Sequence, residues 1–496
     1  MNKDNQINFN HIAYVLLSVI IFVFPFSFLA FTIGEDVTNF FPAFSDEIIN
    51  LHQAITFSSV GFSGGYYTVD EMAASFSFSH FFSHGISYPL IYGTLINIFN
   101  TDHYVAIVIN SFFYCASFII VCYLVKLEVK QSLTLFLIYV TFWPAQIYMM
   151  TSMRLVFFCA IYVIISGMLY YYYSKEKPRP LHIFVLLIIV SFSIVAKITS
   201  IIFILPIIYL ALKTSPKLIL AFIVTLVCIY SAYFSLATSA PFPNFFSSVL
   251  THLVESPSHA ISLIINNSRA NVIAFFELDE NPLLIGMRIA ILSLLIFSIF
   301  ISTTQEEHRN LGVLISLNLI FILSLTILLY DIEDWRDYRL FAPVLLFCLS
   351  LLVICKCYKP IFAYLILNIL LIGNFIHDYS TWIPYRFPSQ ETLTQLEGYK
   401  NQLGSNLEYD ETGDGWDNTI LVSLNIATSR EVLGIPAGFG ISTFFDVKSL
   451  NPKAIKSRYL FLNQSDYLYL AQSLHLVELD MLDSGNLYIN ANVGDE

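Results

Sequence analysis

Charged residues are scarce in this chain. Only 12% of its 496 residues are Asp, Glu, Lys or Arg, whereas 56% are hydrophobic, and the mean hydropathy is +0.69. A soluble domain of this length would not need the many apolar runs of about 20 residues that the sequence contains. In lipid such runs become helices, because every backbone polar group must be paired internally. The composition therefore predicts a polytopic α-helical membrane protein with the lipid bilayer as its surroundings.

Basic residues are scarcer than acidic ones, with 24 Lys and Arg against 36 Asp and Glu. The formal net charge is −12, which offers no basic face to a nucleic acid and excludes that class of partner. The segment 34–102 contains no Lys or Arg at all. Its charged residues are all acidic, namely Glu35, Asp36, Asp46, Glu47, Asp70, Glu71 and Asp102.

Cysteines suited to disulfides and motifs for soluble cofactors are also missing. The seven cysteines all lie in or beside apolar segments, and none lies in the two long polar regions, which argues against a disulfide framework. Cys355-x-Cys357 flanks Lys356 and indicates a membrane-edge pair rather than a metal site. His80 and His84 lie four residues apart, but no ligand spacing supports a metal there. We expect no cofactor, although the sequence does not rule out a divalent ion.

Eleven apolar segments are candidate membrane spans. The fifth and sixth are short and are separated only by Lys197. Counting them as two spans places the basic loop residues on one side, which the positive-inside rule identifies as the cytoplasm. Merging them into one span would place every later loop on the opposite side of the membrane. The segments are 12–33, 103–125, 132–150, 154–173, 181–196, 198–212, 217–236, 283–303, 311–330, 340–355 and 360–376.

This charge map predicts the organisation of the chain in the plasma membrane. Residues 1–376 form a transmembrane domain with a cytoplasmic N-terminus, and its first apolar run is long enough to be a retained anchor rather than a signal peptide. Residues 34–102 form an extracytoplasmic segment with interfacial helices. Residues 377–496 alternate between strand and helix patterns and predict a small extracytoplasmic α/β domain.

Asp46 and Glu47 follow the first span and are the leading candidates for chemistry. A carboxylate at the membrane edge can act as a general base on an acceptor hydroxyl or amine. The same residues suit the start of a helix, because Ser45 is a good N-cap and acids are favoured in the first turn. The two interpretations are compatible, so the pair remains a candidate for either role.

Three short motifs accompany this acidic pair. Tyr88-Pro89 lies in the apolar stretch before the second span, Trp143-Pro144 lies near the outer end of the third, and Tyr338-Arg339 precedes Pro343 at the start of a late span. Together with the span layout and the outer tail, these motifs resemble the GT-C superfamily of polyprenyl-phosphate-sugar glycosyltransferases. That group includes protein O-mannosyltransferases, lipid A aminoarabinose transferases and O-antigen-modifying transferases.

The resemblance implies roles for particular residues. Asp46 would be the general base and Glu47 a supporting or acceptor-orienting carboxylate. The leaving phosphate of a polyprenyl-phosphate sugar donor needs cationic partners, and these would be Arg339, Arg336 and Lys197. Contacts to donor or acceptor would come from His84, Tyr88 and Arg154. The chain departs from the family at Arg154, where an acidic residue is common, and at Asn100, where Gly is usual.

The predicted function is an inverting membrane glycosyltransferase. It would transfer a sugar from a polyprenyl-phosphate donor to a cell-surface glycan or lipid, such as O-antigen, on the outer face of the membrane. One alternative is a lipid-linked polysaccharide polymerase, which would depend more on outer arginines than on paired carboxylates. Another is a transporter or flippase, which would favour two related halves with broken helices, and no internal repeat is evident.

Overall fold

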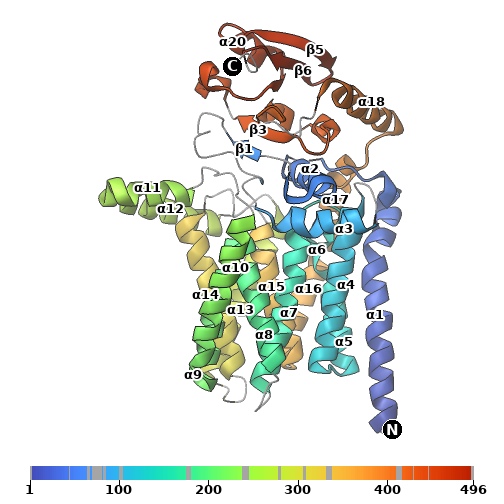
Figure 1. Cartoon of the computed structure of the whole chain (residues 1–496). Helices are drawn as coiled ribbons and strands as arrows, with labels where there is room; N and C mark the ends of the chain where they lie inside the picture. The colour runs from blue at the N-terminus through green and yellow to red at the C-terminus, as the bar shows by residue number, and fades with distance from the viewer. Residues whose placement is uncertain are drawn as a thin grey trace.

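The computed structural model contains a helix bundle covered at one end by a mixed sheet (Figure 1). We call that end of the bundle the sheet side. The described residues are 3–43, 45–63, 67–69, 81, 85–99, 104–174, 180–236, 245–277, 281–304, 306, 309–330, 338–408, 416–427, 429–444 and 446–492.

Helices occupy all eleven of the predicted apolar segments. Among the described residues, five helices are long and apolar enough to cross a membrane, and two bent pairs raise that number to seven if each pair is one span. The five are α1 (Lys3–Thr32), α4 (Val105–Val125), α7 (Leu155–Ser174), α13 (Pro282–Thr304) and α14 (Arg309–Leu329). The protein is therefore multi-pass, whereas the predicted number of eleven spans is not established.

The other predicted spans are bent or short. The bent pairs are α5 (Val129–Thr141) with α6 (Trp143–Met149), at 57°, and α16 (Tyr358–Leu370) with α17 (Ile372–Trp382), at 56°. Pro144 occupies the first turn of α6, where its missing N–H costs no hydrogen bond. The shorter helices are α8 (Pro180–Ala196), α9 (Ile204–Thr214), α10 (Lys217–Leu236) and α15 (Tyr338–Ile354).

Lys197 separates two helical segments, as the charge map requires. Its backbone is extended (φ −149°, ψ 112°), and the 3₁₀ helix η5 (Ile198–Phe203) follows it and leads into α9. α9 lies at the end of the bundle opposite the sheet (Figure 1). The fifth and sixth predicted spans are therefore two segments and not one broken helix.

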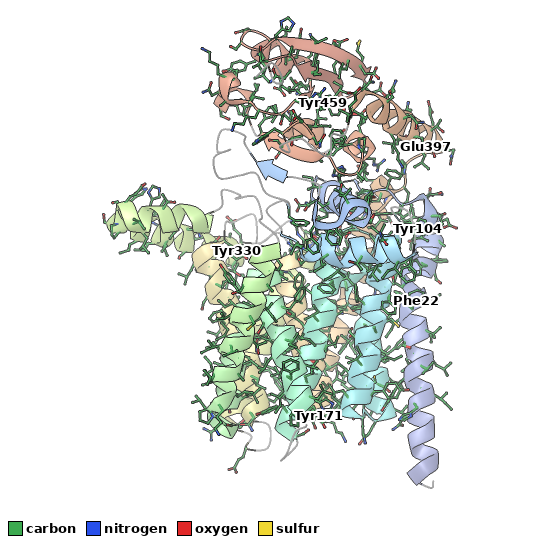
Figure 2. The ribbon with its side chains drawn as sticks, viewed as in Figure 1. Phe22, Tyr104, Tyr171, Tyr330, Glu397 and Tyr459 are labelled. Atoms are coloured by element: carbon green, nitrogen blue, oxygen red, sulfur yellow. The ribbon has the colours of Figure 1, made fainter. Side chains whose placement is uncertain are left out.

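Basic loop residues meet at the end of the bundle opposite the sheet. The Lys356 ammonium lies 2.6 Å from Glu128 Oε1, and the Lys130 ammonium lies 4.5 Å from the centre of the Tyr358 ring. Figure 2 places Tyr171 at this end and Tyr330 at the sheet side. This clustering agrees with the one-sided charge map drawn from the sequence.

A layer of short helices crosses the sheet-side ends of the spans. α2 (Ser45–Val60) packs on the π-helical turn η4 (Pro89–Gly93) and on α3 (Thr94–Phe99). Leu51 and Ala54 of α2 are buried against Tyr88 and Tyr92. A side chain at Gly93 would approach the Ala54 carbonyl oxygen to 2.6 Å, so glycine permits this close contact.

Within the described residues, the C-terminal sheet has six strands in the order β1-β3-β2-β4-β6-β5. Strands β1 to β4 pair in parallel, and β6 and β5 are antiparallel additions. Helix α18 (Gln390–Asn406) lies between β1 and β2 in the chain, and α20 (Gln464–Leu470) lies between β4 and β5. The strands are β1 (Tyr67–Val69), β2 (Thr419–Ser423), β3 (Gly440–Phe444), β4 (Tyr459–Leu462), β5 (Leu476–Leu482) and β6 (Gly485–Asn490).

Two features on the sheet side of the bundle differ from what the sequence predicts. β1 comes from the first extracytoplasmic segment and pairs with β3, so the sheet includes residues from both predicted domains. The stretch between the predicted spans 217–236 and 283–303 contains α11 (Phe245–Glu255) and α12 (Pro257–Phe276), which extend sideways from the bundle (Figure 1). The side-chain amide of Asn271 donates to the Tyr330 carbonyl at 2.6 Å and ties α12 to the end of α14.

Gly312 provides a test of the packing between α13 and α14. A Cβ atom there would lie 2.5 Å from the Ser298 carbonyl oxygen and 2.7 Å from the Ser302 amide nitrogen, both backbone atoms. We expect Gly312→Ala to lower the free energy of unfolding by about 1–3 kcal/mol, as overpacking does. Denaturation in detergent micelles measures this change.

Gly373→Ala in α17 is the matched control. Among the described residues, no atom beyond its chain neighbours and its own helix backbone lies within 4 Å of the added Cβ, so the substitution should stabilise the helix by about 0.5–1 kcal/mol. Equal effects of the two substitutions would show that α13 and α14 do not pack as closely as described here.

Candidate functional site

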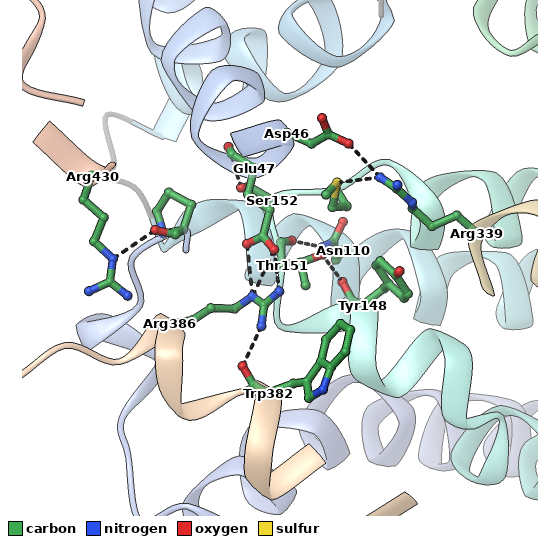
Figure 3. Close-up of polar contacts among 12 residues, drawn as sticks. Asp46, Glu47, Asn110, Tyr148, Thr151, Ser152, Arg339, Trp382, Arg386 and Arg430 are labelled. Atoms are coloured by element: carbon green, nitrogen blue, oxygen red, sulfur yellow. Dashed lines mark hydrogen bonds and ion pairs between the residues drawn. The ribbon is translucent and has the colours of Figure 1, made fainter. Parts of the chain in front are cut away.

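The first turn of α2 presents two carboxylates to different neighbours. Asp46 and Glu47 are the acidic residues of this turn, and successive residues of a helix point about 100° apart. Figure 3 shows Asp46 directed toward Arg339 and Glu47 directed toward Arg386. The helix start and the acidic pair predicted from the sequence thus coincide.

Asp46 forms an ion pair with Arg339. Its Oδ2 lies 2.8 Å from Nη1 of Arg339, which is in the first turn of α15. The side chains are 33% and 38% exposed, and the Met153 sulfur lies 3.6 Å from the same guanidinium nitrogen. A partly exposed pair of this kind contributes little net stability and can exchange partners.

Lys197 lies beside this pair. Its Nζ donates a hydrogen bond to the Arg339 carbonyl oxygen at 3.0 Å and lies 5.2 Å from the centre of the Phe158 ring. The break between α8 and η5 thus places an ammonium group against the start of α15. Asp46, Arg339 and Lys197 come from three distant parts of the chain and meet at the sheet side.

Arg154 is a third cation in the same region. It precedes α7, and its Nη1 donates to Ser87 Oγ at 3.0 Å and to the Ala196 carbonyl oxygen at 3.3 Å. Ala196 immediately precedes Lys197, so Arg154, Lys197 and Arg339 bring three cationic side chains to one region, with Arg339 in direct contact with Asp46. Such an arrangement suits an anionic ligand.

Glu47 forms a buried pair with Arg386. The Arg386 Nε lies 3.1 and 3.0 Å from the two carboxylate oxygens, and Nη2 contacts Oε1 as well. The side chains are 1% and 4% exposed. The Ser152 hydroxyl donates to the Glu47 carbonyl oxygen at 2.8 Å, and Arg386 Nη1 donates to the Trp382 carbonyl oxygen at 2.8 Å.

This pair is a structural clamp on α2. It joins α2 to the short 3₁₀ helix η7 (Pro384–Arg386), which follows the last predicted span. With both carboxylate oxygens held by one guanidinium, Glu47 fixes the start of α2 against η7. Sequence reasoning did not identify Arg386. Its signal was a single basic residue in the apolar-aromatic stretch 382–387.

The structure describes only some of the remaining residues that the sequence predicts for the site. Tyr88 is 1% exposed and stacks on Tyr92 with ring centres 4.0 Å apart, so it belongs to the core below α2. The Tyr92 hydroxyl donates to Asn110, whose amide donates to the Thr151 carbonyl oxygen at 2.9 Å. The predictions for His84 and Arg336 fall outside the described residues.

Within the described residues, no group of three or more His, Cys, Asp or Glu side chains could hold a metal ion. The cationic groups in the region of Asp46 are guanidinium and ammonium donors, which suit oxyanions such as phosphate.

No known family model matches the sequence, and a search of curated proteins found no match. Among solved structures, the chain is similar to the *Archaeoglobus fulgidus* oligosaccharyltransferase in complex with Zn and sulfate. The TM-score is 0.50 at 10% identity, covering 98% of this chain and 74% of that one. At this identity the similarity shows the fold alone, and that fold agrees with the one that the sequence resemblance implies.

ArnT from *Cupriavidus metallidurans* also matches at 9% identity, over 98% of this chain and 99% of that one. The TM-score is 0.42 for its complex with undecaprenyl phosphate and 0.43 for the apo state.

Glu47→Gln tests the structural clamp. The substitution leaves the Arg386 guanidinium buried without its counter-charge, so the free energy of unfolding should fall by about 3–5 kcal/mol. Denaturation in detergent micelles, followed by intrinsic fluorescence, measures the loss.

Glu128→Gln is the control, because Glu128 and its partner Lys356 are 60% and 53% exposed. Its loss should be less than about 1 kcal/mol. A Glu47→Gln variant as stable as this control would contradict the assignment of the clamp.

Proposed function

We propose that this chain, which shares the GT-C fold, is a membrane glycosyltransferase that uses a polyprenyl-phosphate sugar donor. The acceptor is a glycan or lipid at the outer face of the plasma membrane. The observation that carries the proposal is the partly exposed Asp46 carboxylate, held against Arg339 with Lys197 and Arg154 beside it. The fold similarity to an oligosaccharyltransferase supports the same class of reaction.

The cations suit the donor's phosphate. In a polyprenyl-phosphate sugar the phosphate is a diester with one negative charge, and departure as polyprenyl phosphate adds a second. Arg339 and Lys197 lie where apolar helices end at the sheet side, so a lipid tail can lie along the bundle while the phosphate meets them. Fixed cations stabilise the charge that develops on the leaving group.

Asp46 is the general base in this proposal. The acceptor oxygen attacks the anomeric carbon as the bond from that carbon to the phosphate oxygen breaks. The phosphate oxygen keeps the electron pair, and Asp46 takes the acceptor's proton. A single displacement of this kind inverts the anomeric centre. The acceptor hydroxyl must come within hydrogen-bond reach of Asp46.

The ion pair with Arg339 makes base activity depend on the donor. While Arg339 contacts Asp46, the guanidinium occupies the carboxylate that has to take the acceptor's proton. A donor phosphate offers Arg339 a better partner, because its oxygens match the guanidinium fork. Donor binding thus transfers Arg339 to the phosphate and leaves Asp46 to accept a proton.

The orientation of the chain belongs to the same proposal. Lys130 and Lys356 lie at the end of the bundle opposite the sheet, and the positive-inside rule assigns that end to the cytoplasm. The site around Asp46 and the C-terminal sheet would then face outward, where cell-surface acceptors are found.

Asp46→Asn and Arg339→Gln test separately the role of Asp46 as general base and the role of Arg339 in binding the donor phosphate. We expect Asp46→Asn to lower the turnover rate by about 10²–10⁴-fold, as loss of a general base does, while donor binding is retained because Arg339 is released from its partner. Arg339→Gln should instead weaken donor binding by about tenfold or more. Transfer from undecaprenyl-phosphate sugars and direct donor binding, both measured in detergent, distinguish these effects.

Mass spectrometry of surface glycans tests the proposal in cells. A strain that lacks the gene should lose the mass of one sugar, which wild type restores and Asp46→Asn does not. Glu391→Gln, at an exposed position of α18, is the control and should restore it. Full restoration by Asp46→Asn would contradict the base assignment, and an altered chain length with all sugars retained would point to a polymerase.

A further inference from the structure

A second hollow region lies at the junction of α2 with the C-terminal domain. One cavity of about 550 Å³ lies between α2, α3 and α18, and another of about 490 Å³ lies beside η7 and the start of α18. Arg430, in the 3₁₀ helix η8 (Arg430–Gly434), lines both. We call the two cavities together the junction groove.

The junction groove is separate from the site around Asp46. Its α2 wall is made by Leu51, Ile55, Ser58 and Ser59. Because helix residues advance by about 100° each, Ile55 points to the side of α2 opposite to Asp46. A ligand in the groove would therefore not lie against the Asp46 carboxylate.

Arg430 supplies positive charge to this groove. Its side chain is half-buried, and its Nε donates to the Pro42 carbonyl oxygen at 3.2 Å. Figure 3 shows Arg430 to one side of the Glu47–Arg386 pair. Glu47 is already bound to Arg386, so the charge on Arg430 is only partly balanced from that side.

The electrostatic surroundings agree with this geometry. Burial lowers the pKa of Arg430, and the neighbouring Arg386 guanidinium lowers it further, while Glu47 acts in the opposite direction. Lys400 also lines the larger cavity, where Glu397 is the one acidic lining residue among those described. The groove thus carries a surplus of positive charge that an anion would neutralise.

The rest of the lining suits a saccharide. The larger cavity presents hydroxyl and amide side chains from Ser58, Asn97 and Gln390, and the smaller one presents Thr392 and Ser429. Such groups can both donate to and accept from sugar hydroxyls. Tyr385 is 64% exposed at the edge of the smaller cavity and offers a flat apolar face with a polar tip.

We propose that the junction groove binds a saccharide that carries a carboxylate or phosphate group, with Arg430 as the anion contact. Arg430 lines both cavities and supplies the guanidinium for the anion, the hydroxyl and amide side chains hold the sugar hydroxyls, and Tyr385 covers one sugar face. The saccharide can be part of a free glycan or of a glycolipid headgroup, because both present the same chemistry to the groove.

Binding to the purified full chain in nanodiscs tests this proposal without any transferase assay. Tetragalacturonate is the soluble acidic probe and maltotetraose its uncharged counterpart. A vesicle of phosphatidylcholine with an acidic ganglioside presents the anionic sugar on a lipid. Wild type should bind at least one acidic probe, and Arg430→Gln should weaken that binding by about tenfold or more, as expected for loss of a charge-assisted contact.

Lys448→Gln is the matched control, since it removes one positive charge from an exposed position of the same domain, outside the groove. It should bind like wild type. Tyr385→Ala removes an exposed ring, so it tests the groove even if Arg430→Gln misfolds. It should also weaken binding of the acidic probes. Soluble-probe binding identifies a free glycan as the ligand source, and binding of the vesicle alone identifies a glycolipid.

The proposal is overturned if maltotetraose binds as tightly as tetragalacturonate, or if Arg430→Gln and Tyr385→Ala both bind the acidic probes like wild type. It is also overturned if neither acidic probe binds wild type.

Discussion

The buried pair between Glu47 and Arg386 is the interaction on which the arrangement of the site depends. It joins the first turn of α2 to η7, at the point where the chain leaves the membrane helices for the C-terminal domain. The Ser152 hydroxyl adds a contact from the turn before α7. Because the clamp fixes the start of α2, it also fixes the direction in which the neighbouring Asp46 points.

Two adjacent carboxylates therefore have different physical properties. Glu47 is excluded from water and is held by several hydrogen bonds from one guanidinium, so releasing it would leave a buried charge unpaired. Asp46 is about one-third exposed and forms a partly exposed ion pair with Arg339, and pairs of this kind contribute little net stability. The first carboxylate holds the helix, and the second is the one that the proposed mechanism uses as a base.

Much of the fold could be predicted from the sequence, because apolar runs and charge asymmetry are local signals. They located the helices, the break at Lys197 and the basic end of the bundle. They also placed Asp46, Arg339 and Lys197 at one face. They could not predict that Arg339 contacts Asp46, 293 residues away, or that Arg386 clamps Glu47, since such pairings depend on tertiary packing. The strand β1 is only three residues long and pairs with β3 far along the chain, so its sequence has no detectable period.

In the proposed mechanism, Asp46 and the donor phosphate compete for Arg339. Electron cryomicroscopy of the wild-type protein in nanodiscs, with and without undecaprenyl phosphate, tests it most directly. We expect the bound phosphate to contact the Arg339 guanidinium, Asp46 to lose its contact with Arg339, and the Glu47–Arg386 pair to stay in place. A phosphate bound elsewhere, with the Asp46–Arg339 pair intact, would contradict it.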